Sequence, residues 1–80
     1  MRIRVLWFAA LKERAGFGES EWSAPEDGAT VQSVLDALSD VYPFLRGYPL
    51  AVAVNRRLAG RDQVLRDGDE LALLPPVSGG

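Results

Sequence analysis

The feature that most constrains the fold is one amphipathic segment in the middle of the chain, residues 31–42. Its apolar residues recur at the spacing of a single helix face: Val31, Val34, Leu35, Leu38, Val41 and Tyr42. Thr30 is a good N-cap residue, and Pro43 ends the helix. A helix with one apolar stripe cannot bury that stripe alone, so the rest of the chain must form the surface that covers it.

The segments on both sides of this helix have the patterns of β-strands. In residues 2–8 apolar side chains alternate in direction, with Ile3, Val5 and Trp7 on one side and Arg4, Leu6 and Phe8 on the other. Residues 9–15 predict a short helix that ends at Gly16. Further strands are expected over residues 19–23, 50–54, 57–59 and 70–74. The expected connections are turns over residues 25–28, 55–56 and 67–69, with a loop or 3₁₀ turn over residues 61–66.

This order of elements predicts an α+β fold in which a mixed sheet packs on one main helix. In a chain of 80 residues it is the pattern of a β-grasp, ubiquitin-like fold. We expect one domain over residues 1–74. Residues 75–80 are then a flexible, extended tail, because Pro75 and Pro76 lack the backbone donors that a continuing sheet needs.

Composition excludes most kinds of active site. The chain has neither cysteine nor histidine, which removes disulfides, thiol nucleophiles, imidazole bases and nearly all zinc or iron–sulfur sites. A net charge of −2 provides no electrostatic attraction to nucleic acid or anionic membranes. The sequence shows neither a membrane-spanning run nor a signal peptide. We therefore expect a cytoplasmic protein that binds no metal, nucleic acid or membrane.

The sequence ends in Gly79-Gly80, a pair expected by chance at the end of only about 0.5% of chains. The one reactive group that such a tail offers is its α-carboxylate. Glycines lack Cβ and can pass through a narrow channel. Activating a carboxylate requires ATP, and the chain has no phosphate-binding loop of the G-x-x-x-x-G-K type. A second protein would have to activate it. The alternative is an end without function.

Three other groups of residues admit two interpretations each. The acidic run of residues 67–70 either shapes a turn or contacts a partner. Four arginines are either solvated or dock a partner: Arg56, Arg57, Arg61 and Arg66. The third group forms an exposed apolar face, and hence a protein interface, unless something within the domain covers it: Leu6, Phe8, Leu58 and Leu74.

Several stretches match a known family. They are Val5-Leu6-Trp7-Phe8-Ala9, Ala53-Val54-Asn55, Asp67-Gly68-Asp69-Glu70 and Leu74-Pro75-Pro76-Val77-Ser78-Gly79-Gly80. On these residues the chain resembles the small subunit of molybdopterin synthase, a β-grasp sulfur carrier. The proline pair before the Gly-Gly end is the most discriminating part, since sulfur carriers of the thiamine pathway lack it.

The resemblance implies a function for the tail. An E1-like adenylating enzyme would use ATP and Mg²⁺ to adenylate Gly80, and a sulfurtransferase or cysteine desulfurase system would convert it to a thiocarboxylate. The tail, Pro75, Pro76, Val77, Ser78, Gly79 and Gly80, would then enter the large subunit, where the active-site residues lie, and donate sulfur to cyclic pyranopterin monophosphate. This chain would itself bind no cofactor.

The resemblance also implies the interface, with Phe8, Leu58 and Leu74 contacting the large subunit in a heterotetramer of two carriers and two large subunits. Leu74 stands where the family often has an aromatic residue. Other functions stay open. The alternatives are a sulfur carrier for tRNA thiolation or thiamine synthesis, a ubiquitin-like modifier conjugated through Gly80, and a plain binding module.

Overall fold

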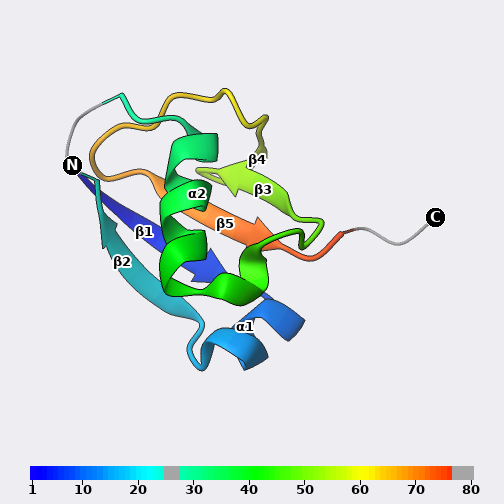
Figure 1. The fold of residues 1–80 in the computed structure, drawn as a ribbon. Coiled ribbons are helices and arrows are strands. Elements are labelled where there is room, and N and C mark those ends of the chain that lie inside the picture. Colours follow the sequence, from blue (N-terminus) through cyan, green and yellow to red (C-terminus); the bar gives the residue numbers. More distant parts are fainter. Residues whose placement is uncertain (25–27, 77–80) are drawn as a thin grey trace.

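Five strands form one mixed sheet, and one long helix lies across a single face of it (Figure 1). The computed structural model describes residues 1–24 and 28–76. The elements in chain order are β1 (Arg2–Trp7), α1 (Ala10–Ala15), β2 (Glu19–Ser23), α2 (Val31–Val41), the 3₁₀ helix η1 (Pro43–Leu45), β3 (Ala51–Val54), β4 (Arg57–Leu58) and β5 (Glu70–Leu74). This arrangement confirms the predicted α+β class.

The strands lie in the order β2-β1-β5-β3-β4. β1 is antiparallel to β2 and parallel to β5, and β3 is antiparallel to both β5 and β4. Because β1 and β5 are parallel, their carboxyl ends meet at one edge of the sheet. Phe8 and the first tail residue, Pro75, therefore emerge from the same end of the molecule.

Helix α2 begins and ends close to where its sequence predicts. The Thr30 hydroxyl oxygen accepts a hydrogen bond from the Ser33 amide at 3.2 Å, which confirms the cap. Its buried residues are Val31, Val34, Leu35 and Leu38. The prediction for Val41 is wrong, because this side chain is 56% exposed. Val41 lies on one flank of the stripe, seven residues after Val34, and in the last turn that flank is open to solvent.

Trp7 anchors the core at the end of α2. Its side chain is only 2% exposed, and its indole Nε1 donates to the Ser20 hydroxyl at 3.0 Å. The ring centroid lies 5.8 Å from that of Phe17, 4.9 Å from Tyr42 and 6.3 Å from Phe44. One side chain of β1 thus holds together the start of β2, the end of α2 and the 3₁₀ helix, in the edge-on geometry that aromatic pairs prefer.

The acidic run before β5 has the structural role that its sequence allowed. A carboxylate oxygen of Asp67 accepts from the Arg2 amide at 2.7 Å. The Asp69 carboxylate accepts from the Arg66 amide at 2.8 Å and from the Asn55 side-chain amide at 3.0 Å. These bonds tie the turn before β5 to the start of β1 and to the β3–β4 turn.

Two of the other predicted connections can be compared with the structure, and one falls largely outside the described residues. Asn55 and Arg56 both have positive φ, 49° and 70°, which confirms a tight turn between β3 and β4. Residues 61–66 form a loop without a 3₁₀ helix, and Val64 makes an isolated bridge with Thr30. The turn predicted over residues 25–28 falls mainly on residues 25–27, which lie outside the described residues. Neither α-helix in the described ranges is long and apolar enough to cross a membrane.

We expect Trp7→Ala to lower the free energy of unfolding by about 3–5 kcal/mol, because it leaves a large cavity at the junction of four elements. Urea denaturation followed by circular dichroism measures this change. Val41→Ala is the matched control and should change stability by less than about 0.5 kcal/mol, since its side chain is already in water. A similar loss in both variants would contradict the assignment of Trp7 as the anchor.

Candidate functional site

The face of the sheet opposite α2 carries an apolar row that crosses four strands. Strand pairing aligns Leu6 with Ala72, Ala72 with Ala53, and Ala53 with Leu58. Side chains alternate along a strand, and the neighbours of Leu6, Ala53 and Ala72 belong to the core under α2, so the row points away from the helix. The two alanines are buried between larger neighbours, whereas Leu58 is 79% exposed.

A second apolar row lies beside the first, at the base of the tail. The Phe8 amide donates to the carbonyl of Leu73 at 3.3 Å, so β1 and β5 stay paired to their ends. Leu74 pairs with Ala51 of β3. Phe8 is 44% exposed and Leu74 is partly buried. We call the two rows together the open face: Leu6, Phe8, Ala51, Ala53, Leu58, Ala72 and Leu74.

Charged residues border the open face at the end remote from the tail. Arg4 lies one step before Leu6 on the same side of β1 and forms ion pairs with Glu19 at 2.9 Å and with Glu70 at 3.8 Å. Such exposed pairs contribute at most about 1 kcal/mol. The apolar area is therefore confined to the half of the sheet face from which the tail leaves.

The structure brings the predicted interface residues together. Phe8 and Leu74 lie at adjacent strand ends, and Leu58 lies on the same face, on β4. Pro75 and Pro76 follow β5 without continuing the strand. The other predicted tail residues, Val77, Ser78, Gly79 and Gly80, lie outside the described residues. Apolar side chains exposed in this way mark a protein interface more often than a catalytic site.

Sequence reasoning missed the three alanines of the open face, Ala51, Ala53 and Ala72. The alternation in β5 contained a signal for one of them, because Ala72 stands between the buried residues Leu71 and Leu73. The position of these alanines relative to one another was not predictable from the segments taken separately. Because alanine side chains are small, the open face is lower in the middle of the sheet than at Leu58 on one side and at Leu6 and Phe8 on the other.

The arginines of the β3–β4 turn and the following loop, Arg56, Arg57, Arg61 and Arg66, are all exposed. The Arg61 guanidinium donates to the carbonyl of Leu50 at 3.0 Å, so this residue joins its loop to the start of β3. Arg57 pairs with Val54, whose side chain is in the core under α2, so Arg57 points to the α2 side of the sheet and away from the open face.

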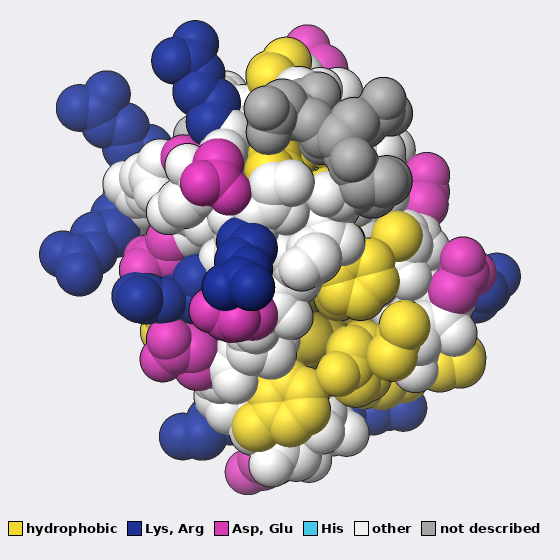
Figure 2. Space-filling view, turned by 90° about the vertical axis from the view of Figure 1, so that its left-hand side faces the viewer, with side chains coloured by type: hydrophobic (Ala, Val, Ile, Leu, Met, Phe, Trp, Pro, Cys, Tyr) yellow, Lys and Arg dark blue, Asp and Glu magenta, His cyan; other side chains and the backbone are white. Residues whose placement is uncertain are grey.

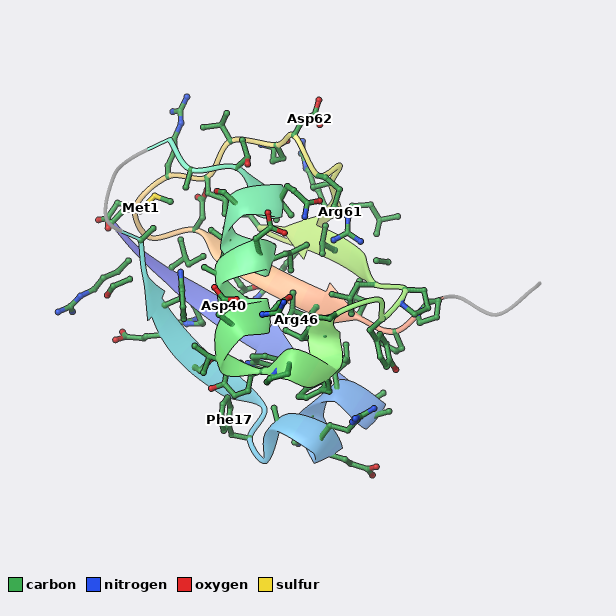
Figure 3. All side chains as sticks on the ribbon, in the orientation of Figure 1. Met1, Phe17, Asp40, Arg46, Arg61 and Asp62 are labelled. Carbon is green, nitrogen blue, oxygen red and sulfur yellow. The ribbon has the colours of Figure 1, made fainter. Side chains whose placement is uncertain are left out.

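A cleft of about 680 Å³ opens on the other side of the molecule, between α2 and residues 45–50. Charged residues of its lining are already paired, since Arg46 contacts Asp40 at 2.6 Å (Figure 3). Gln32 donates to Asp36 at 2.8 Å. Within the described residues no three Asp, Glu, Cys or His side chains are grouped as metal ligands would be.

Comparison with known proteins gives consistent results. The model of the ThiS family matches residues 5–80. The molybdopterin synthase sulfur carrier subunit of Escherichia coli is 40% identical over 82 residues, covering 98% of this chain and 99% of that protein.

Two solved structures extend the comparison. H. volcanii small archaeal modifier protein 1 has a TM-score of 0.83 at 31% identity, covering 95% of this chain and 98% of the other. A protein–protein complex of subunits 1 and 2 of molybdopterin-converting factor from Helicobacter pylori contains a chain with a TM-score of 0.63 at 30% identity, with full coverage of both chains. These likenesses confirm the predicted β-grasp fold.

We expect Leu58→Asp to leave the free energy of unfolding within about 0.5 kcal/mol of that of the unchanged protein, because the new carboxylate stays in water. Leu73→Asp, two strands away in the buried face, should prevent folding, since an unpaired buried charge costs several kcal/mol. Urea denaturation of the two variants measures the contrast. A large loss for Leu58→Asp would mean that the open face is covered in solution.

Proposed function

The chain belongs to the ThiS family, and from its full-length similarity to molybdopterin synthase sulfur carrier subunits we propose that it is the sulfur carrier of a molybdopterin synthase. The observation that carries the proposal is the apolar open face at the root of a tail that ends in Gly79-Gly80. A carrier needs a surface for docking and a backbone end that reaches into its partner. Both lie at the same end of this sheet.

The chemistry of the proposal takes place on the α-carboxylate of Gly80. A carboxylate is a poor electrophile, so an E1-like enzyme that uses ATP and Mg²⁺ first joins it to AMP and releases pyrophosphate. A sulfur nucleophile from a sulfurtransferase or cysteine desulfurase system then displaces AMP and leaves a thiocarboxylate. That sulfur passes to cyclic pyranopterin monophosphate, where it becomes part of the dithiolene, and the Gly80 carboxylate is restored by water.

The composition of the chain is compatible with this chemistry. The sulfur is carried on the terminal carbonyl carbon, so the absence of cysteine is no obstacle. The acyl-adenylate also reacts with amines, and the only lysine is Lys12, in α1. The amino terminus donates a hydrogen bond to the carbonyl of Ala24 at 2.9 Å and begins β1, at the opposite end of the sheet from the tail. The activated tail therefore has few amines of its own to attack.

The proposed partner for the open face is the large subunit of the synthase, in a heterotetramer of two carriers and two large subunits in the cytoplasm. Phe8, Leu58 and Leu74 supply the apolar contact, and Pro75 and Pro76 hold the root of the tail extended. The chain with a related fold in the Helicobacter pylori complex of subunits 1 and 2 supports a partner of this kind.

A second candidate function is that of a ubiquitin-like modifier joined through Gly80 to lysines of other proteins. The similarity to H. volcanii small archaeal modifier protein 1 favours it specifically. A carrier for tRNA thiolation or thiamine synthesis would use the same thiocarboxylate. The modifier differs chemically, because its Gly80 ends in an isopeptide bond and holds no sulfur.

We expect mass spectrometry of the protein from its native cells to show a fraction in which one oxygen at Gly80 is replaced by sulfur. Deleting Gly80 should abolish both this species and molybdopterin synthesis in the same cells, because the reactive carbonyl is displaced by one residue. Gly80 found in isopeptide linkage to lysines, without thiocarboxylate, would favour the modifier instead. Normal molybdopterin synthesis after the deletion would rule out the sulfur carrier.

We expect Phe8→Asp and Leu58→Asp each to weaken binding to the large subunit at least about tenfold, since truncating or charging a central apolar contact costs more than 1 kcal/mol. Isothermal titration calorimetry measures the change. Val64→Asp is the matched control, because Val64 is also half exposed but lies on the loop beside α2. Equal weakening by all three variants would indicate a general effect of charge and would contradict the docking role.

A further inference from the structure

A second apolar surface lies along the outer edge of the sheet, on the α2 side and therefore away from the open face. Figure 2 views the molecule from this edge and shows hydrophobic side chains gathered over one half of it, with charged side chains over the other. Four residues of β2, of the turn before it and of α2 contribute: Phe17, Trp22, Ala37 and Val41. We call this surface the edge patch.

Helix geometry places these residues on one side. Leu35, Ser39 and Gln32 line the cleft beside residues 45–50, so they form the flank of α2 nearest β3. Positions 37 and 41 fall on the opposite flank, toward β2. Trp22 pairs with Ile3, whose side chain is in the core under the helix, so Trp22 also faces α2. Phe17 precedes β2 and lies below the end of α2, where its ring is 6.0 Å from that of Tyr42 (Figure 3).

The backbone beside the edge patch is free to pair. Met1 and Ala24 exchange two hydrogen bonds of 2.9 Å, and Trp7 donates to the carbonyl of Gly18 at 2.9 Å. In an antiparallel ladder such pairs alternate along the strands. The N–H and C=O groups of Glu19, Glu21 and Ser23 therefore point away from β1. β2 is an end strand, and no other strand in the described ranges pairs with this edge.

The charges on this edge select the occupant. Glu19 and Glu21 lie on the side of β2 opposite Trp22. Arg4 of β1 stands directly across from Glu21, but its guanidinium forms its ion pairs with Glu19 and Glu70. Glu21 has no ion-pair partner among the described residues. A second copy that paired antiparallel around the middle of β2 would place Glu21 against its equivalent, which is destabilising. A segment with basic side chains at that position is favoured instead.

We propose that the β2 edge binds an extended segment of a partner protein, which adds a sixth strand to the sheet. Alternate side chains of that segment would be apolar, against Trp22 and Val41, and basic, beside Glu21. Addition of a strand to an open edge takes its affinity from main-chain hydrogen bonds and its specificity from alternate side chains. The edge patch lies on the α2 side of the sheet and the open face on the other, so binding at the two surfaces can be tested separately.

The test uses the full chain labelled with ¹⁵N and a short synthetic peptide of alternating lysine and valine. We expect saturable shifts of the Glu19, Glu21 and Ser23 amide signals, with slower hydrogen exchange at these amides. Glu21→Pro removes an outward N–H while sparing the bonds to β1, as proline on an edge strand can, and should weaken binding about fivefold. Val41→Asp should weaken it about tenfold, by charging the apolar contact.

Control variants and peptides separate this site from the rest of the molecule. Val64→Asp should bind the peptide normally, and a peptide of alternating glutamate and valine should not bind. Absence of saturable shifts, shifts confined to the open face, or equal affinity in Glu21→Pro would overturn the proposal. Sedimentation showing that the protein dimerises, with the dimer lost in Glu21→Pro, would assign the edge to a second copy. Thiocarboxylation of Gly80 should be unchanged in these variants, so the sulfur-carrier function is tested separately.

Discussion

The parallel pairing of β1 with β5 is the interaction on which the rest of the molecule depends. It joins the first strand of the chain to the last, aligning Val5 with Leu71 and Trp7 with Leu73. All four of these side chains are buried under α2. Because the strands run the same way, Phe8 and the tail leave the sheet side by side. An antiparallel pairing of the same two strands would place the tail at the other end, next to the amino terminus.

The two faces of this sheet have divided roles. The helix side holds the core, in which Trp7 links four elements through aromatic contacts and one hydrogen bond. The other side keeps apolar residues in water, with Leu58 the most exposed of them. Burying these residues within the monomer would stabilise the domain, and the proposed large subunit would recover that free energy by covering them. In the proposed function the chain needs no reactive side chain, since the Gly80 carboxylate would carry the chemistry.

Much of this architecture was predictable because its signals are local. The bounds of β2, β5 and α2, the Thr30 cap and the turn at Asn55 and Arg56 all follow from side-chain period and backbone preference within a few residues. The failure at Val41 is of another kind. Val41 fits the helical stripe, yet whether a flank of the stripe is covered depends on the strand that lies beside it. The loop predicted over residues 61–66 is present, but its bridge from Val64 to Thr30 is a tertiary contact that the segment alone does not predict.

The sequence by itself determined the class of the fold, the stripe of α2 and the alternation of β1. These properties depend on the order and spacing of residues along one segment. Only the tertiary structure decided which rows of side chains meet across strands. The register that aligns Leu6, Ala72, Ala53 and Leu58 sets the first strand beside the last, and a shift by one residue would turn the side chains of a strand to the other face. The open face results from that register and the free edge of β2 from the strand order, and both exist only once distant strands lie beside one another.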